Sequence, residues 1–184
     1  MDHPLDVPRL TAGDSFVLHP WEFGDLPLVQ EASSDEYIPL ITTVPSTYSQ
    51  EAGEAFVRRQ WERASTGSGY PFVIVRVQDS QPVGTIGLWL RDVNEGRASL
   101  GYWLARSARG QGVAAAALRA VAAWGLGDLK IPRLQLCLEP WNAASARTAE
   151  RVGFQREGLL RSWQMVGAER RDIIMYSLLS ADLS

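Results

Sequence analysis

Two neighbouring stretches decide the fold of this chain: Leu100-Gly101-Tyr102-Trp103-Leu104 and Arg109-Gly110-Gln111-Gly112-Val113-Ala114. Large apolar and aromatic residues in the first predict the end of a strand, and small apolar residues at helical spacing after Gly112 predict a helix. Glycines at such a junction let backbone N–H groups approach an anion without hindrance from a Cβ atom. The helix N-terminus adds unsatisfied donors and a partial positive charge, and Arg109 adds a guanidinium. These features favour a phosphate site over a plain tight turn, which is the alternative.

The residues around this junction predict a mixed α/β chain. Runs of β-branched and aromatic residues, separated by turn residues, predict strands over residues 15–19, 71–77, 83–90, 97–104, 133–139, 155–163 and 172–179. Apolar residues at helical spacing predict helices over residues 25–34, 49–64, 113–125 and 142–152. Ser49 and Asn142 are suitable N-caps, Gly153 is a suitable C-terminal glycine, and Pro27 is a potential break in the first helix. A strand meander followed by strand–helix–strand–helix–strand is typical of an α/β fold.

Length and composition indicate one globular domain over residues 1–184. The chain has 184 residues, of which 46% are hydrophobic and 21% charged, so it can bury a sizeable core without disulfides or a structural metal. It has no apolar run of the length that crosses a bilayer, and Met1-Asp2-His3-Pro4 lacks the features of a signal peptide. We therefore expect a cytoplasmic protein with no membrane partner.

The scarcity of cysteine and histidine disfavours several enzyme classes. Cys137 is the only cysteine, and His3 and His19 are the only histidines. A disulfide within the chain is therefore impossible, and zinc hydrolases, Cys-His enzymes and Ser-His-Asp enzymes are disfavoured. We expect no metal. The net charge of -3 and the lack of a clustered basic stripe argue against a nucleic-acid partner.

Two phosphate ligands fit the glycine-rich junction. Gly110-x-Gly112-x-x-Ala115 matches the relaxed dinucleotide fingerprint, and Glu139 ends the next strand, where a ribose-binding acid is expected. However, that fingerprint normally opens the first strand–helix unit, and too few residues follow Glu139 for the rest of a doubly wound sheet. Coenzyme A also carries a pyrophosphate, and a coenzyme A site does not need the remaining units of a doubly wound sheet.

The junction resembles the acetyl-CoA signature of the GNAT N-acetyltransferases, Arg/Gln-x-x-Gly-x-Gly/Ala. The resemblance covers roughly residues 15 to 179 and extends to the RimJ/RimL branch, the ribosomal-protein alanine N-acetyltransferases, through Gly101-Tyr102-Trp103-Leu104, Asn142-x-x-Ser145 and Gly153-Phe154. It implies a GNAT fold, with a mostly antiparallel sheet of about six to seven strands and about four helices. It also implies acetyl-CoA as cosubstrate and a protein N-terminus or a small amine as acceptor. Dimers are common in the family, which makes a homodimer one candidate assembly.

The resemblance assigns roles to individual residues. The backbone at Leu104 is expected to pair with the pantetheine arm as an added strand, and Asn142 to hydrogen-bond the same arm. Ser145 is the candidate that protonates the departing thiolate. The alternatives are that Asn142 is only a helix cap and that Ser145 bonds the backbone of the first turn. The residues implied at the pyrophosphate are Arg109, Gly110, Gln111, Gly112, Val113 and Ala114.

One position departs from the pattern of the branch. Relatives often carry a glutamate two residues before the Gly-Tyr pair, where it takes the proton of the amine, and here that residue is Ser99. Serine cannot act as this base. Glu139 is the best replacement because it ends the strand beside the expected thioester, and the alternative is a solvated strand end.

The loss of the glutamate bears on the acceptor. An α-amine with a pKa of about 7.8 costs roughly 1 kcal/mol to deprotonate at pH 7, whereas a lysine with a pKa of about 10.4 costs roughly 4.6 kcal/mol. An α-amine or another amine of low pKa is therefore favoured, and the negative net charge adds mild support for a cationic acceptor. The sequence predicts an N-acetyltransferase that works by direct attack. The alternatives are an acyl-CoA-binding module with little turnover and a dinucleotide-binding protein.

Overall fold

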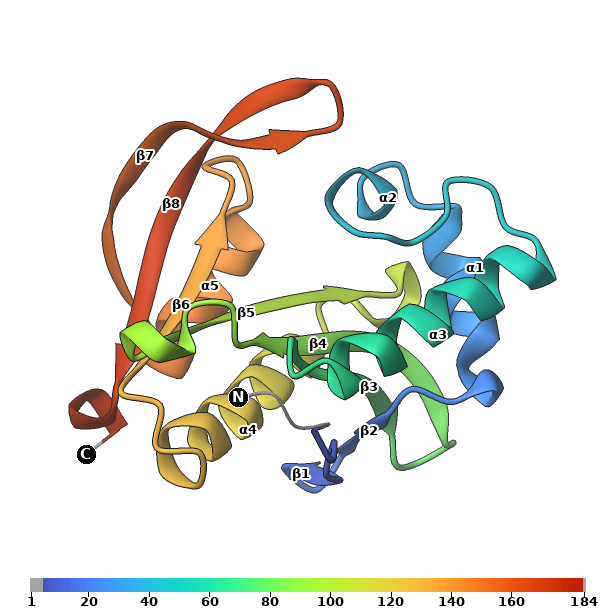
Figure 1. The fold of residues 1–184 in the computed structure, drawn as a ribbon, viewed down its shortest axis with the longest axis horizontal. Coiled ribbons are helices and arrows are strands. Elements are labelled where there is room, and N and C mark those ends of the chain that lie inside the picture. Colours follow the sequence, from blue (N-terminus) through green and yellow to red (C-terminus); the bar gives the residue numbers. More distant parts are fainter. Residues whose placement is uncertain (1–4, 184) are drawn as a thin grey trace.

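The computed structural model describes residues 5–183 and confirms the expected mixed α/β class. These residues form one eight-stranded sheet in the order β1-β2-β3-β4-β5-β6-β8-β7 (Figure 1). The strands are β1 (Leu10–Ala12), β2 (Phe16–Pro20), β3 (Gly69–Arg76), β4 (Gln81–Trp89), β5 (Arg97–Leu104), β6 (Arg133–Leu138), β7 (Gln155–Val166) and β8 (Glu169–Leu179). The helices are α1 (Leu26–Ser33), α2 (Ile38–Ile41), α3 (Gln50–Ser65), α4 (Val113–Gly127) and α5 (Ala143–Val152).

The structure has more elements than the sequence predicted. Within residues 5–183 there are eight strands and five helices, where six to seven strands and four helices were expected. The added strand, β1, has three residues, too few for an alternating pattern. The added helix, α2, is one turn long, and Asp35 Oδ1 accepts from the backbone N–H groups of Tyr37 at 2.9 Å and Ile38 at 3.0 Å. Both elements are too short for periodicity to reveal.

Local signals placed most helix ends correctly. Ser49 caps α3 by accepting from Ala52 N at 3.1 Å, and Gly153 ends α5 in the left-handed region with φ 108°. Pro27 does not break α1. It lies in the first turn, where the backbone N–H has no intrahelical acceptor, so the missing donor costs nothing there.

One pair of strands differs from all the others in the sheet. β5 and β6 are parallel, whereas every other neighbouring pair is antiparallel. Their pairing runs from Arg97 opposite Arg133 to Leu100 opposite Leu136 and then stops. β5 stays paired with β4 as far as Leu104, so the two parallel strands part beyond Leu100. A sheet with one parallel pair is not a doubly wound dinucleotide-binding sheet.

The two long helices cover opposite faces of the sheet. On one face Gly125 of α4 lies against Leu88 and Leu134, and a Cβ atom there would be 3.4 Å from Leu134. On the other face Arg63 of α3 lies over the ring of Trp89. Because successive residues of a strand point to opposite faces, Leu88 and Trp89 assign the helices to different sides. No helix among the described residues is long and apolar enough to span a membrane.

The hairpin of β7 and β8 extends beyond the body of the sheet and bends toward α2 (Figure 1). The pairing of the two strands shifts between Leu160 and Gln164, and Ser162 inside this irregularity has φ 50°. Asp172 accepts from the Ser162 N–H at 2.7 Å, which fixes the bend. At the hairpin turn, a Cβ atom on Gly167 would lie 3.3 Å from Leu40 of α2. The hairpin and α2 therefore meet above the place where β5 and β6 part.

Candidate active site

The glycine-rich junction forms a loop of free backbone donors. Gly110 and Gly112 have φ 77° and 78°, a conformation that favours glycine, and a Cβ atom on either would meet nothing within 4 Å. The first helical hydrogen bond of α4 runs from Ala116 N to Gly112 O at 3.1 Å. Among residues 5–183 no acceptor is seen for the backbone N–H groups from Gly110 to Ala115. These unsatisfied donors lie at a helix N-terminus, as an anion site requires.

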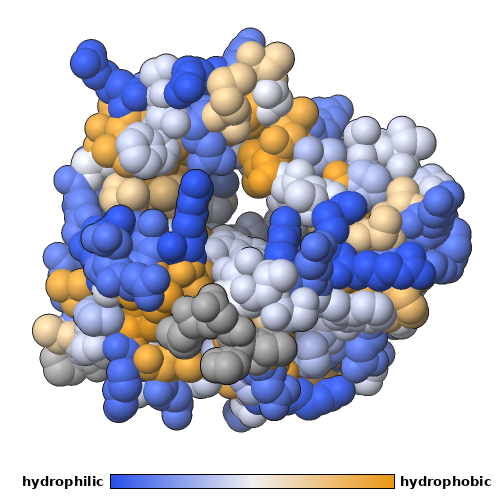
Figure 2. Space-filling model, in the orientation of Figure 1, coloured by the Kyte–Doolittle hydropathy of each residue, from blue (hydrophilic) through white to orange (hydrophobic). Residues whose placement is uncertain are grey.

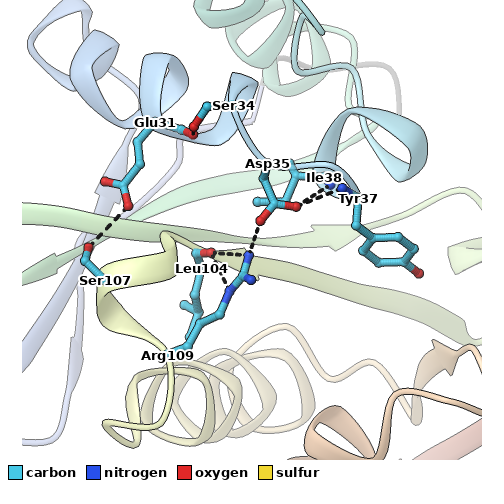
Figure 3. A network of polar contacts seen from close by, with 8 residues as sticks. All are labelled: Glu31, Ser34, Asp35, Tyr37, Ile38, Leu104, Ser107 and Arg109. Carbon is cyan, nitrogen blue, oxygen red and sulfur yellow. Dashed lines mark hydrogen bonds and ion pairs between the residues drawn. The ribbon is translucent and has the colours of Figure 1, made fainter.

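The side chain of Arg109 is used inside the protein. It donates to Leu104 O at 3.3 Å through Nε and at 3.2 Å through Nη2, and it donates to Asp35 Oδ2 at 2.7 Å (Figure 3). Although burial opposes the charged form, the N–H groups of Tyr37 and Ile38 and the Arg109 guanidinium lower the pKa of Asp35. A second tie joins Ser107 to Glu31 at 3.2 Å. Arg109, which the sequence predicted to donate to a phosphate, therefore links the glycine-rich loop to the segment between α1 and α2.

A cavity of about 720 Å³ lies where β5 and β6 part. Its wall is formed by β4, β5 and β6, by α3, by residues 37–43, by Asn142 and Ser145, and by the hairpin of β7 and β8. The space-filling view shows the molecule hollowed near its centre, between the hairpin side and the α2 and α3 side (Figure 2). Among the lining residues, Glu139 carries the acidic side chain and Arg63 carries the basic one.

Glu139 is not a solvated strand end, which was the alternative at this position. It follows β6, is only 6% exposed and lines the cavity. Its Oε2 accepts from the Tyr37 hydroxyl, and its Oε1 lies 3.8 Å from Arg171 Nε. Burial and the Glu139 carboxylate raise the pKa of Tyr37, so this hydroxyl keeps its proton and donates it. Tyr37 comes from the segment before α2, and nothing in the sequence pattern pairs it with Glu139.

Asn142 and Ser145 meet at the start of α5 and both line the cavity. Asn142 Oδ1 accepts from Ser145 N at 3.1 Å, so the helix-cap role of Asn142 is confirmed. The cap uses the oxygen of the amide and leaves its nitrogen for a ligand in the cavity. The Ser145 hydroxyl lies beside the buried Tyr102 hydroxyl, which makes no hydrogen bond of good geometry in the described chain. Burial raises the pKa of Tyr102.

Ser99 and Cys137 are the remaining candidate residues. Ser99 lies in β5 opposite Trp89 of β4 and beside Gln135 of β6, and it is not among the residues that line the cavity. Cys137 lines the cavity, with its Sγ 4.0 Å from Met175 Sδ, and burial raises the pKa of its thiol. A protonated thiol is a poor nucleophile, so this environment does not favour a covalent role for Cys137. Among residues 5–183 no group of three or more His, Cys, Asp or Glu is arranged to hold a metal ion.

Residues 15–155 match the family described as Acetyltransferase (GNAT) domain. This chain belongs to the GNAT acetyltransferase family. The resemblance seen at the glycine-rich junction is thereby confirmed, and the free donors of the loop lie at the start of α4, inside the matched region.

Individual relatives agree with this family. The chain is 32% identical over 116 residues to the Bacillus licheniformis protein named "Uncharacterized N-acetyltransferase p20", a match that covers 63% of this chain and 65% of that protein. The match therefore spans less than two thirds of the relative. Among solved structures, Mycobacterium smegmatis RimJ in complex with CoA-disulfide has a TM-score of 0.82 at 24% identity, over 98% of this chain and 90% of RimJ. A GNAT-family acetyltransferase from Bacillus anthracis has a TM-score of 0.78 at 22% identity, over 96% of this chain and 100% of that chain. The structural matches establish the GNAT fold.

Proposed function

We propose that this protein is an acetyl-CoA-dependent N-acetyltransferase that acetylates a primary amine by direct attack of the amine on the thioester. The observation that carries the proposal is the loop of free N–H groups from Gly110 to Ala115, in the same fold as RimJ, which was solved with CoA-disulfide. Beside this loop the parting of β5 and β6 leaves one edge of β5 without a partner strand beyond Leu100. An edge of this kind accepts an extended, amide-containing chain as an added strand, which suits a pantetheine arm. At Leu104, whose backbone was predicted to pair with the pantetheine arm, the carbonyl already accepts from Arg109.

The residues of the cavity suit the proton transfers of such a reaction. When bound, acetyl-CoA supplies an activated acetyl group and a thiolate leaving group. The amine nitrogen forms the new C–N bond, and the C–S bond breaks. In the proposed assignment Glu139 receives the proton of the amine, because it is the acid of the cavity wall and is held in place by Tyr37 and Arg171. Ser145, beside the buried Tyr102 hydroxyl, protonates the departing thiolate.

The proposed acceptor is an α-amine, of a protein N-terminus or of a small molecule. With Ser99 outside the cavity wall, Glu139 is the one cavity acid that can remove the proton. Deprotonation costs about 3.5 kcal/mol less for an α-amine than for a lysine side chain, so the α-amine depends less on this acid. Comparable or better turnover on lysine side chains than on free N-termini would refute this preference. A cytoplasmic location and a homodimer stay predictions.

The first test is calorimetric titration of the purified protein with acetyl-CoA, CoA and NAD. Binding of acetyl-CoA without binding of NAD is expected. Gly112→Asp should abolish acetyl-CoA binding, because it places a carboxylate at the pyrophosphate and strains a backbone with φ 78°. The matched control is Gly127→Asp, at the far end of α4, where a Cβ atom meets nothing within 4 Å and φ is not in the left-handed region. Full affinity in Gly112→Asp would remove the main support for the proposal.

A second candidate function is an acyl-CoA-binding module with little turnover. It is favoured by the Glu139 carboxylate, whose two oxygens are engaged by Tyr37 and Arg171. Thiol release in the presence of peptide N-termini and small amines separates the two candidates. Release above the rate of hydrolysis supports the enzyme, and tight binding of acetyl-CoA with no release on any amine supports the module.

A further inference from the structure

Arg63 places a positive charge in the wall of the cavity. Its guanidinium carbon lies 5.1 Å from the centre of the Trp89 ring, and its Nη1 donates to Gln60 Oε1 at 2.9 Å. Gln60 is only 3% exposed, and its own Nε2 donates to Phe56 O at 3.1 Å, so the oxygen that holds Arg63 is itself fixed. A longer contact of 3.4 Å joins Arg63 Nη2 to Thr43 Oγ1. The guanidinium is therefore oriented by uncharged partners.

This charge has no acidic partner. Arg63 and its neighbour Arg59, one turn earlier on α3, form no salt bridge with an Asp or Glu among residues 5–183. Arg58 on the exposed side of the same helix does pair, with Glu54 at 2.8 Å. Burial and the like charge of Arg59 lower the pKa of Arg63. Two neighbouring cations without a carboxylate are costly to keep partly buried, and an anionic ligand would relieve that cost.

The indole of Trp89 connects Arg63 with the place where β5 and β6 part. A Cβ atom on Gly87 would lie 2.2 Å from Trp89 Cζ2, so the ring lies directly over this glycine. The indole Nε1 would lie 3.6 Å from a Cβ atom on Gly101, the first residue of β5 beyond the last pair with β6. The indole therefore has Arg63 over its face and Gly101 beside its Nε1 edge, so it connects Arg63 with the place where the two strands part.

We propose that the acceptor carries a carboxylate in addition to its amine, and that Arg63, seated on Trp89, binds this carboxylate. The inference rests on the proposed function, since the amine must reach the thioester at the parting of β5 and β6. A guanidinium binds a carboxylate through two parallel N–H···O bonds, and Arg63 has donors left after its contacts with Gln60 and Thr43. Two sources share this chemistry: the α-carboxylate of a free amino acid, and an acidic side chain at the start of a peptide.

The test compares two pairs of acceptors, and in each pair one acceptor carries a carboxylate and the other carries the corresponding amide. L-alanine against L-alaninamide tests the free amino acid, and the peptide amides Asp-Ala-NH2 against Asn-Ala-NH2 test the acidic side chain. In at least one pair, kcat/KM with acetyl-CoA should be on the order of 10- to 100-fold higher for the carboxylate. Arg63→Gln should remove this preference by lowering kcat/KM more for the carboxylate than for the amide. Arg63→Lys should restore part of it, because lysine keeps the charge without the planar fork.

The control is Arg58→Gln, on the same helix but outside the cavity wall, which should leave the preference intact. Equal kcat/KM within both pairs, or an equal loss for carboxylate and amide in Arg63→Gln, would overturn the inference. Should no amine be acetylated at all, the proposed function fails by itself. The carboxylate site is then judged by calorimetric titration with N-acetyl-L-alanine and N-acetyl-L-aspartate, each against its amide. Selective binding of a carboxylate that Arg63→Gln removes supports the site, and no selectivity overturns it.

Discussion

Glu139 shows at the residue scale how surroundings, more than position, define what a side chain can do. At the end of a strand it could have been a solvated carboxylate. The structure buries it to 6% exposure and gives each oxygen a partner from a different element, Tyr37 from the segment before α2 and Arg171 from β8. A carboxylate held from two sides has a fixed orientation, which an efficient proton acceptor needs.

Replacing Glu139 by glutamine tests its role directly. Glu139→Gln keeps the shape of the side chain and removes its capacity to accept a proton, so kcat should fall by about 100-fold or more while the Kd for acetyl-CoA stays within a factor of about two. The loss should be larger for an acceptor lysine than for an α-amine. Steady-state assays with calorimetric titration measure both constants. Unchanged turnover in both Glu139→Gln and Ser145→Ala would show that neither group transfers a proton.

Tyr102 allows a prediction about stability. Its buried hydroxyl makes no hydrogen bond of good geometry, so Tyr102→Phe should leave the free energy of unfolding unchanged or raise it by up to about 1 kcal/mol. The matched control is Tyr176→Phe, which removes a hydroxyl that donates to Glu150 at 3.2 Å and should cost about 1 kcal/mol. Urea denaturation measures both variants. The Ser145 and Thr148 side chains lie near this hydroxyl, so a clear loss of stability in Tyr102→Phe would mean that it bonds one of them.

At the scale of elements, the short segment between α1 and α2 connects the two functional regions. Asp35 caps α2 and holds Arg109 of the glycine-rich loop (Figure 3). Two residues later, Tyr37 donates to Glu139. The loop proposed for the pyrophosphate and the acid proposed for proton transfer are thus fixed by neighbouring residues of one segment. We therefore expect a change in either contact to affect both the glycine-rich loop and Glu139.

The pair of Asp35 and Arg109 has a pH dependence whose sign follows from the lowered pKa of Asp35. In the unfolded chain the carboxyl titrates near 3.8, and in the folded protein it titrates lower. Its stabilising contribution is therefore complete above about pH 5 and is lost as the pH falls through the lower folded value. Asp35→Asn should cost about 0.5–1 kcal/mol at pH 7, and the difference from the native protein should shrink in acid.

Urea denaturation at pH 7 and at pH 3 measures that difference. The exposed neighbour Glu36 supplies the control, since Glu36→Gln should change stability by less than about 0.5 kcal/mol at either pH. A cost of Asp35→Asn that grows on acidification would contradict the assignment.

The sequence predicted contacts between residues that lie close together along the chain, and it did not predict contacts between distant segments. The glycines of the loop and the caps Ser49, Asn142 and Gly153 act within a few residues, and the structure confirms their local geometry. The contacts that shape the cavity join distant segments. Tyr37 meets Glu139 across 102 positions, and Arg63 lies on Trp89 across two strands and a turn. No periodicity or spacing encodes such pairs, so they became visible only in the fold.

Across the whole molecule, the sheet divides where the proposed coenzyme would bind. β5 and β6 are joined by only the pairs from Arg97–Arg133 to Leu100–Leu136, and beyond them the cavity separates the two halves of the sheet. A ligand held by the start of α4, the edge of β5 and Asn142 would bridge these halves. Ligand that binds only the folded state adds about 2.7 kcal/mol of stability at 100 times its Kd.

For a chain of this size that gain corresponds to a rise in Tm of roughly 5–10 °C. Acetyl-CoA at 100 times its Kd should produce this rise in the native protein and in Gly127→Asp, and none in Gly112→Asp, whereas NAD at the same concentration should produce none in any of them. A scanning calorimeter measures all of these melts. A rise with NAD alone would instead point to a dinucleotide in the loop. An equal rise with acetyl-CoA in Gly112→Asp would place the coenzyme elsewhere, because a coenzyme that bridges the two halves of the sheet requires the free N–H groups at the start of α4.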